Sequence, residues 1–348
     1  MEQSGKIHRL MATPETDKHR LNNDSQPNIL QIRNLKTFFS TPFGLAKAVN
    51  GVSWSLARKE TLGIVGESGC GKSVTALSIL KLVLCPPGKY VAGEILFDGK
   101  NLLTLSESKM RDIRGNRISM IFQDPMSSLD PVFTIGDQIS EAFQLHRGIS
   151  RKEALDHSIE MLRLVKIPSP EKRIREYPYQ MSGGMQQRVM IAMALACRPQ
   201  ILLADEPTTA LDVTIQAQIL DLMLQLKEEL ETSIVLITHN FGVIAEMAQR
   251  VIVMYAGEIV EEARGKEIFE NPLHPYTRGL LKSMPRLDEK GKKQSRLDEI
   301  PGVVPSLNCL PQGCLFSPRC EQATHRCHSE PPPLNTASGQ RSVRCWIS

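Results

Sequence analysis

The stretch "GESGCGKS", from Gly66 to Ser73, decides how the rest of this sequence is interpreted. It matches the pattern G-x-x-x-x-G-K-[ST], in which a glycine-rich loop turns its backbone N–H groups toward phosphate oxygens. The apolar run Thr61–Val65 precedes it and predicts a buried strand, whereas "KSVTALSILKLVL" follows it and predicts a helix. A helix that begins at the loop directs its positive end at the same phosphates. The stretch therefore predicts a site for the phosphate groups of a nucleotide.

The loop residues have distinct predicted roles. Lys72 can reach the β- and γ-phosphates, and the Ser73 hydroxyl can ligate Mg²⁺. The other positions are expected to contact phosphate mainly through their backbone N–H groups. The predicted nucleotide-binding residues of the loop are Gly66, Glu67, Ser68, Gly69, Cys70, Gly71, Lys72 and Ser73.

A second apolar run, "ILLADEP", ends in the carboxylates Asp205 and Glu206. The run predicts a buried strand, and α/β proteins bind ligands at the carboxyl ends of such strands. Asp205 suits the Mg²⁺ shell. Glu206 suits a base that polarises a water molecule for in-line attack on the γ-phosphate. Because a phosphate loop accompanies this pair, we interpret it as catalytic rather than as a solvated strand end.

The remaining pattern predicts an α/β fold. Residues 29–100 contain short β-type runs, and residues 130–180 have a helical pattern. Ser150 and Glu153 stand at the spacing of a capping box, which predicts the start of a helix. "SIVLITHN" is a further apolar run of the kind found in buried parallel strands. After about residue 265 the chain is rich in Pro, Gly and charge, which predicts a loop-built tail.

Length, charge and hydropathy exclude several classes of protein. The 348 residues suggest about two domains. A net charge of +4 is too weak to imply nucleic acid or an anionic membrane as a partner. The longest apolar run, Val189–Cys197, is too short to cross a bilayer. The N-terminus lacks the apolar segment of a signal peptide, so residues 1–28 are predicted to be a disordered arm on a cytosolic protein.

Four more motifs resemble those of ATP-binding cassette (ABC) ATPases, and they occur in that family's order. "IFQDP" resembles the Q-loop and contains Gln123, and "MSGGMQQR" resembles the family signature. "TTALD" resembles the D-loop and ends at Asp212, and "ITHN" resembles the switch motif and contains His239. With the phosphate loop and the carboxylate pair, they identify the chain as a member of the family. The resemblance implies that Gln123 helps to hold Mg²⁺ and that His239 contacts the γ-phosphate.

The resemblance also implies a domain organisation. It implies a P-loop cassette with a RecA-like core, an antiparallel β subdomain and a helical signature subdomain at about residues 130–185. We place the ATPase domain at residues 29–264 and a loop-rich C-terminal extension at residues 265–348.

The signature predicts a second phosphate site. Ser182 begins a helix, and Gly183 and Gly184 expose backbone N–H groups there. In the family, the signature and the phosphate loop lie on separate lobes. The resemblance therefore implies that two chains arranged head to tail enclose ATP between the phosphate loop of one and the signature of the other, with Asp212 near the nucleotide.

The adenine ring is expected to stack on an aromatic residue upstream of the phosphate loop, as is usual in this family. Phe43, in "TPFGLAKAVNG", has about the right position. Phe38 and Phe39 are nearby alternatives, and a core position for Phe43 stays open as the simpler interpretation.

Three classes of cassette ATPase remain open: a transporter motor, a soluble ATPase that acts on DNA or ribosomes, and a regulatory module that binds ATP without turnover. The chain has one cassette and no long heptad run, whereas soluble relatives tend to carry coiled coils, zinc inserts or a second cassette. A regulatory module would be expected to lack Glu206 or His239, and both are present. The sequence therefore favours the transporter motor.

Longer stretches, among them "DPMSSLDPVFTIGDQI" and "HPYTRGLLKSMP", resemble the dipeptide/oligopeptide importer ATPases of bacteria. The resemblance implies a second, related ATPase in a head-to-tail heterodimer, two integral membrane permeases and an extracytoplasmic peptide-binding protein, with no nucleic acid. It places the chain on the cytoplasmic face of the inner (cell) membrane, with the segment after Gln123 against the permeases. Since the ATPase does not contact the cargo, nickel, glutathione or another small solute stays open as an alternative to peptides.

Five of the eight cysteines lie in the last forty residues. Disulfides are not expected in a reducing cytosol. Unrelated free thiols stay open as the simpler interpretation, but five in forty residues is dense, and a metal site would order a tail without a core of its own. Gaps of five, six and seventeen residues separate four of these cysteines, which is wide for zinc. A [4Fe–4S] cluster takes four thiolates and spreads its attachment points. The proposed ligands are Cys314, Cys320, Cys327 and Cys345.

The same tail resembles the peptide-importer subfamily in which this cysteine set binds a [4Fe–4S] cluster. The resemblance implies an iron–sulfur site, with zinc as the alternative and Cys309 as the spare thiol. Its expected role is structural or redox-sensing, because the ATP site is complete without it.

Overall fold

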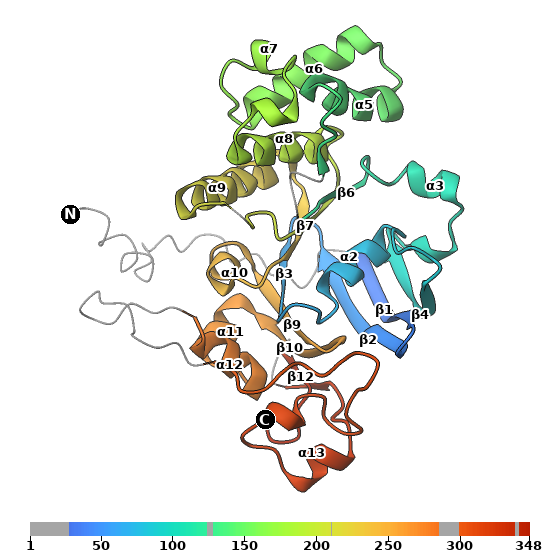
Figure 1. The fold of residues 1–348 in the computed structure, drawn as a ribbon, viewed down its shortest axis with the longest axis vertical. Coiled ribbons are helices and arrows are strands. Elements are labelled where there is room, and N and C mark those ends of the chain that lie inside the picture. Colours follow the sequence, from blue (N-terminus) through green and yellow to red (C-terminus); the bar gives the residue numbers. More distant parts are fainter. Residues whose placement is uncertain (1–27, 124–127, 210, 285–298, 338–340) are drawn as a thin grey trace, which may run out of the picture.

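The computed structural model describes residues 28–123, 128–209, 211–284, 299–337 and 341–348. It shows two sheets and a group of helices beyond one end of the larger sheet (Figure 1). The predicted α/β fold is confirmed. The predicted N-terminal arm, residues 1–28, lies outside the described residues except for Asn28, which begins a strand.

The larger sheet has a parallel centre with antiparallel strands added along one side. In sheet order its strands are β11 (Asn335–Thr336), β12 (Ser342–Val343), β10 (Glu258–Arg264), β9 (Arg250–Tyr255), β3 (Thr61–Val65), β8 (Ser233–Ile237), β7 (Ile201–Asp205) and β6 (Ile118–Ile121). The strands from β9 to β6 are parallel neighbours. Every residue of β3, β7 and β8 is buried, as expected for central strands that are covered on both faces.

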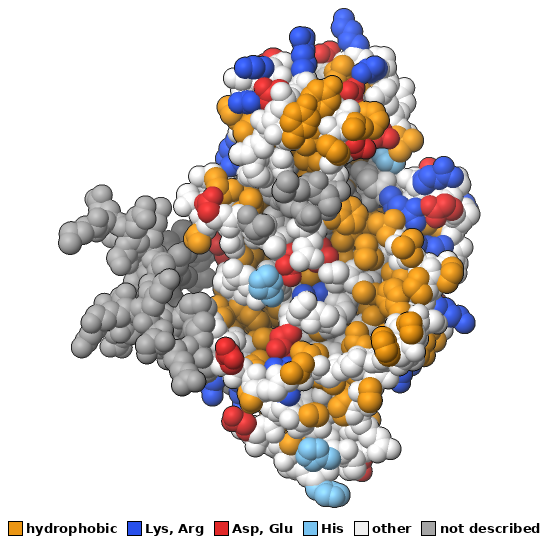
Figure 2. All heavy atoms as spheres, in the orientation of Figure 1, with side chains coloured by type: hydrophobic (Ala, Val, Ile, Leu, Met, Phe, Trp, Pro, Cys, Tyr) orange, Lys and Arg blue, Asp and Glu red, His pale blue; other side chains and the backbone are white. Residues whose placement is uncertain are grey.

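The smaller sheet is antiparallel and lies beside α2 (Lys72–Ile79), the helix after the phosphate loop (Figure 1). In order its strands are β2 (Gly44–Ala57), β1 (Asn28–Thr41), β4 (Gly88–Phe97) and β5 (Lys100–Asn101). The strands predicted within residues 29–100 are therefore present. Figure 2 shows many apolar side chains on the face of the molecule formed by this sheet.

The helix α2 is shorter than its sequence pattern predicts. The apolar pattern runs on to Leu84, but α2 ends at Ile79. Lys81 has a φ of 50°, and its N–H donates to the carbonyl oxygen of Ser78. A residue in the left-handed region stops a helix because the next turn cannot follow on the same axis.

The helical subdomain lies beyond the end of the larger sheet that carries β6 (Figure 1). Its helices are α5 (Ile135–Arg147), α6 (Arg151–Leu164), α7 (Pro170–Arg173) and α8 (Gly183–Leu195). Ser150 caps α6 as predicted, since its hydroxyl accepts the N–H of Glu153. Leu162 near the end of α6 and Val165 directly after it are fully buried.

Further helices cover the sheets or connect their strands. The α-helices are α3 (Glu107–Arg111), α9 (Val213–Leu230), α10 (Phe241–Met247), α11 (Gly265–Glu270), α12 (Pro275–Lys282) and α13 (His325–Ser329), and the short 3₁₀ helices are η2 (Leu102–Thr104), η3 (Pro178–Gln180) and η4 (Ser317–Arg319). Helix α9 buries Ile219, Leu222 and Leu226, which are spaced so that they lie on one face of the helix. No helix among the described ranges combines the length and apolar character that a membrane span requires.

The C-terminal extension is more ordered than the predicted loop-built tail. It begins with α11 and α12, and β12 then pairs with β10 of the larger sheet. Phe316 is buried and packs against Tyr255 and Tyr276. The apolar side chains of the tail therefore join the core of the ATPase domain instead of building a separate core. The proposed boundary between residues 264 and 265 remains a prediction.

Candidate active site

Three buried strands deliver the predicted motifs to one edge of the larger sheet. In the parallel ladder, Ile237 of β8 pairs with Ile64 of β3 and with Asp205 of β7. Because the three strands run in the same direction, the residues after them meet at their common carboxyl edge. The phosphate loop, Glu206 and His239 are consequently neighbours, although they lie far apart in the sequence.

The phosphate loop needs glycine where it packs against neighbouring backbone. Gly66 has a φ of 151°, and an added Cβ would lie 2.2 Å from the carbonyl oxygen of Met254. Gly71 has a φ of 102°, and its Cβ would lie 2.2 Å from the carbonyl oxygen of Ala48. Side chains at these positions would push the loop away from the sheet, so the two glycines determine where its N–H groups point.

Lys72 lies in the first turn of α2, with its ammonium group held inside the loop. The side chain is buried, and Nζ donates to the carbonyl oxygens of Gly66 at 2.8 Å and Glu67 at 3.0 Å. These neutral acceptors place the charge at the centre of the loop. Phosphate oxygens would be stronger acceptors for the same ammonium group, because a hydrogen bond between two charged groups is stronger than one to a carbonyl.

Asp205 and Ser73 form a site with the chemistry of a magnesium shell. Asp205 is buried, and its Oδ1 has no hydrogen-bond partner among the described residues. Burial raises the pKa of this carboxyl, and a hydrogen bond from Ser73 opposes the rise. A divalent cation satisfies an orphaned carboxylate oxygen and favours its charged form, and oxygen donors are the ligands that Mg²⁺ prefers. These residues therefore fit the predicted cation.

Glu206 is held by three side chains that come from different parts of the chain. It adopts a φ of 49°, an unusual conformation for a residue with a side chain, at the end of β7. One carboxylate oxygen lies 3.0 Å from Nδ1 of His239, and the other accepts from Thr209 Oγ1 at 2.9 Å and from Gln123 Nε2 at 3.2 Å. Burial raises the pKa of Glu206, but the hydrogen bonds with His239 and Thr209 outweigh burial and lower it below its ordinary value. The side chain is thus ionised near neutral pH, as a base must be.

The signature residues begin α8. Ser182 is the N-cap residue, and Ser182 and Gly183 are exposed. An added Cβ on Gly184 would lie 2.9 Å from Cγ2 of Ile215, so this glycine allows α8 to approach α9. Asp212 caps α9 by accepting the N–H of Ile215 at 2.9 Å. The exposed helix start leaves backbone N–H groups available to an anion from outside the chain.

Phe43 is the most exposed of the three candidate aromatic residues. It lies in the turn between β1 and β2 and is 85% exposed, whereas Phe38 is only 8% exposed. Phe39 is half-buried. A core position for Phe43 is wrong, since its ring is open to solvent. Its adenine contact remains a prediction, and its exposed ring is open to such a contact.

Sequence reasoning missed two side chains of the extension that contact the phosphate loop. The Arg319 guanidinium pairs with the Glu67 carboxylate, and the Tyr276 hydroxyl accepts the N–H of Glu67 at 2.8 Å. The "HPYT" stretch, which contains Tyr276, contributes to the family resemblance but does not itself predict a contact with the loop. Arg319 belongs to no motif that predicts one. A signal was present in the position of Arg319, directly before one of the predicted ligand cysteines.

The four predicted ligand cysteines line one small cavity of about 10 Å³, together with His274. Burial, together with the nearby thiols Cys327, Cys345 and Cys320, raises the pKa of Cys314 to about 11. However, the described part of the chain contains no group of three or more His, Cys, Asp or Glu side chains in an arrangement that could hold a metal ion. The prediction of an iron–sulfur cluster is therefore not supported by the geometry.

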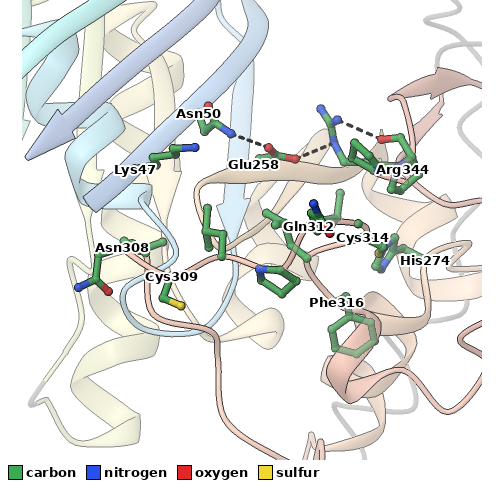
Figure 3. A pocket seen from close by; sticks show the side chains of 18 of the residues that line it. Lys47, Asn50, Glu258, His274, Asn308, Cys309, Gln312, Cys314, Phe316 and Arg344 are labelled. Atoms are coloured by element: carbon green, nitrogen blue, oxygen red, sulfur yellow. Dashed lines mark hydrogen bonds and ion pairs between the residues drawn. The ribbon is translucent and has the colours of Figure 1, made fainter. Parts of the chain in front are cut away.

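A larger cavity of about 550 Å³ is lined by residues of the extension, β2 and β10. Figure 3 shows Asn50, Glu258 and Arg344 linked along one side of it. Asn50 Nδ2 donates to Glu258 at 2.7 Å, and Arg344 Nε lies 3.5 Å from the same carboxylate. These contacts join the extension to both sheets. Cys314 lines both this cavity and the small one.

Comparisons with known proteins agree with this geometry. The family model of the ABC transporter matches residues 49–209, and that of the oligopeptide/dipeptide transporter C-terminal region matches residues 260–327. A probable peptide ABC transporter ATP-binding protein of Sinorhizobium fredii is 56% identical over 320 residues, which cover 92% of this chain and 95% of the relative. The chain belongs to the ATP-binding proteins of ABC transporters. As a member of that family, it is an ATPase with a P-loop cassette fold.

Other relatives of this ABC ATPase carry similar names. An oligopeptide transport ATP-binding protein of Bacillus subtilis is 50% identical, with 92% of this chain and 88% of the relative covered. A dipeptide transport ATP-binding protein of Haemophilus influenzae is 51% identical, with coverage of 91% and 94%. The dimeric structure of a bacterial ABC transporter cassette superposes with a TM-score of 0.61 at 30% identity, covering 68% of this chain and 98% of that cassette.

Proposed function

We propose that this ABC ATPase powers the uptake of di- and oligopeptides through integral membrane permeases at the cytoplasmic face of the cell membrane. The observation that carries the proposal is the C-terminal region, which matches the oligopeptide/dipeptide transporter model and packs against the phosphate loop. The names of the relatives support the same cargo class.

The catalytic step follows from the residues at the sheet edge. Glu206 accepts a proton from the attacking water as the water oxygen bonds to the γ-phosphorus, and the bond between the γ-phosphorus and the bridging oxygen breaks to leave ADP and phosphate. Lys72 and the loop N–H groups hold the phosphates, and His239 both orients Glu206 and contacts the γ-phosphate. Mg²⁺ held by Ser73, Asp205 and Gln123 would neutralise charge on the β- and γ-phosphates when bound.

Each nucleotide is proposed to lie between two different ATPase subunits in a head-to-tail heterodimer. The exposed helix start at Ser182 and Gly183 supplies N–H groups to the nucleotide on the partner's phosphate loop. The dimeric form of the similar cassette structure supports this arrangement. Turnover of this chain alone should then be slow.

The permeases are proposed to dock beside the Q-loop. Val132 and Phe133 follow Gln123 by about ten residues and are 71% and 53% exposed. Exposed apolar side chains shortly after the Q-loop in sequence suit a partner whose movement is coupled to hydrolysis. An extracytoplasmic binding protein would deliver the peptide to the permeases from the opposite side of the membrane.

Transport by the assembled complex tests the cargo. The chain is purified with its permease and ATPase partners, reconstituted into proteoliposomes, and supplied with the binding protein and a radiolabelled dipeptide. We expect ATP-dependent accumulation of the dipeptide, and none with the Glu206→Gln variant. Accumulation of nickel or glutathione without that of peptides would overturn the peptide assignment but leave the ATPase assignment intact.

We also propose that Cys314, Cys320, Cys327 and Cys345 bind a [4Fe–4S] cluster, with zinc as the alternative. Four thiols around one cavity are the donor set that such a cluster requires. The cavity has room for about one water molecule, so the thiols must move apart when a cluster is bound. Anaerobic purification followed by iron, sulfide and zinc analysis tests the proposal. Colourless protein without iron would reject the cluster.

A further inference from the structure

The C-terminal extension holds the phosphate loop through an ion pair. Arg319 Nη1 lies 2.7 Å from Glu67 Oε2, and Nη2 lies 3.0 Å from Oε1, although 252 residues separate the two in the sequence. The pair is bidentate, which is the strongest arrangement of an arginine with a carboxylate. The Arg319 side chain is only 3% exposed, so the pair is far less screened than one on the surface.

The guanidinium group of Arg319 has little freedom to move. Its Nε donates to the carbonyl oxygen of Pro301 at 2.9 Å, and Nη2 donates to that of Ile300 at 3.3 Å. The chain bends closely around the side chain, because a Cβ on Gly302 would lie 3.3 Å from Arg319 Cγ. The hydrogen bond with Glu67 raises the pKa of Arg319, which therefore stays charged. Arg319 is thus a fixed cation to which the loop is attached.

Tyr276 holds the backbone of the same loop residue. Its hydroxyl accepts the N–H of Glu67 at 2.8 Å. The ring is fully buried, 4.6 Å from the ring centroid of Tyr255 and 5.4 Å from that of Phe316. Burial raises the pKa of the Tyr276 hydroxyl, which therefore stays neutral. Both the side chain and the backbone of Glu67 are consequently fixed by the extension.

The tip of the loop is open at Gly69. Gly69 has a φ of 77°, and no atom lies within 4 Å of the position its Cβ would take. A loop that is ordered before its ligand arrives loses less conformational entropy on binding. In addition, the Glu67 carboxylate lies in the loop that receives the phosphates, so without Arg319 its charge would repel them.

We propose that Arg319 and Tyr276 are positioning residues for the phosphate loop, so that the C-terminal extension is part of the nucleotide-binding machinery. Neither residue has to contact the nucleotide. Arg319 neutralises and fixes Glu67, and Tyr276 fixes the direction of its backbone. The same contacts could simply anchor the tail. That role predicts a different pattern of nucleotide binding when the contacts are removed.

Binding of labelled nucleotides to the purified full-length chain distinguishes the two roles. The probes are trinitrophenyl derivatives of ATP, ADP and AMP, because AMP lacks the β-phosphate that the loop and Lys72 are expected to hold. We expect Arg319→Gln to weaken binding of ATP and ADP about tenfold and to change binding of AMP less than about twofold. Arg326→Gln is the matched control, because Arg326 belongs to the same extension but pairs with the exposed Glu330. We expect it to bind all three nucleotides like the parent.

A double-mutant cycle tests the ion pair itself. Glu67→Gln in the Arg319→Gln background removes the unpaired charge, and we expect it to restore most of the lost ATP affinity. If Arg319 only anchors the tail, Glu67→Gln should not restore the ATP affinity. Parent-like ATP binding by Arg319→Gln, or an equal loss for AMP and ATP, would overturn the proposal. So would a loss that Glu67→Gln does not relieve.

Tyr276→Phe provides a second measurement if Arg319→Gln does not fold. It keeps the buried ring and removes only the hydroxyl that accepts from Glu67. We expect ATP and ADP to bind about threefold to fivefold more weakly, with AMP unchanged, as for the loss of one neutral hydrogen bond. ATP binding equal to that of the parent would contradict the role assigned to Tyr276.

Discussion

Nδ1 of His239 lies 3.0 Å from a carboxylate oxygen of Glu206, and the two residues are 33 positions apart in the chain. They follow the neighbouring parallel strands β8 and β7, so the sheet register brings them together. The His239 side chain is 64% exposed, whereas that of Glu206 is only 13% exposed. The histidine therefore connects a buried base to the open side of the site, where a second subunit would close on the nucleotide.

Glu206→Gln should stop ATP hydrolysis without preventing ATP binding. The amide keeps the size of the carboxylate but cannot accept the proton of the attacking water. We expect kcat to fall at least about 100-fold, the lower end for loss of a general base, and the Kd for ATP to change little. Single-turnover hydrolysis and equilibrium binding would be measured on the assembled complex. Hydrolysis at the parent rate would contradict the role of Glu206.

Lys72→Ala should mainly weaken the binding of ATP. The ammonium group is the charged donor of the loop, and losing a hydrogen bond to a charged group should weaken ATP affinity by about 1.5–3 kcal/mol. Lys59→Ala is the control, because Lys59 is an exposed lysine that pairs with Glu231. Isothermal titration with ATP in the presence of Mg²⁺ checks the difference. Equal affinities of the two variants would show that Lys72 does not hold phosphate.

Thr209→Val should move the acid limb of the activity profile to higher pH. Thr209 helps to lower the pKa of Glu206, so its removal raises that pKa. The base is ionised above its folded pKa and is protonated as the pH falls through it, so activity is lost at a higher pH in the variant. We expect a shift of about 0.5 to 1 pH unit, which corresponds to a hydrogen bond of about 1 kcal/mol. The measurement is kcat against pH.

The lowered pKa of Glu206 also affects the stability of the folded protein, which depends on pH in the same direction as the activity. A depressed carboxyl pKa stabilises the folded protein above the unfolded pKa, and this contribution disappears as the pH falls through the folded pKa. Thermal melts of both proteins at each pH would show whether lost activity reflects unfolding. An unchanged acid limb would mean that Glu206 does not limit activity there.

Gly183→Asp should impair the partner's ATP site but not the chain's own. The position is exposed at the start of α8, so a carboxylate there would repel an incoming phosphate without disturbing the core. We expect nucleotide binding by the isolated chain to be unchanged and turnover of the assembled complex to fall at least about tenfold. Ser150→Asp, which places a carboxylate at the N-cap of α6, is the control.

Retention of full turnover by the Gly183→Asp complex would contradict the composite site. An equal loss in the Ser150→Asp complex would instead point to a general effect of charge on the helical subdomain. ATPase assays at several protein concentrations would show whether turnover depends on assembly.

Much of the site was predictable because each motif is local. The loop from Gly66 to Ser73, the carboxylates at the end of β7 and the histidine after β8 each follow a buried apolar run. Such runs predict strands, and parallel strands end at a common edge. Which side chains then bond to Glu206 was not predictable, since Thr209 and Gln123 carried no signal for that contact in their own neighbourhood.

The sequence by itself determined the α/β fold, the family and the order of the catalytic motifs, because these depend on residue types at short, regular spacing. Only the tertiary structure decided that Phe43 is exposed while Phe38 is buried, that four distant cysteines line one cavity, and that Arg319 pairs with Glu67. The first depends on the fold of the smaller sheet, the second on the fold of the extension, and the third on how the extension packs against the ATPase domain. Local patterns do not encode that packing, since the paired residues lie up to 252 positions apart.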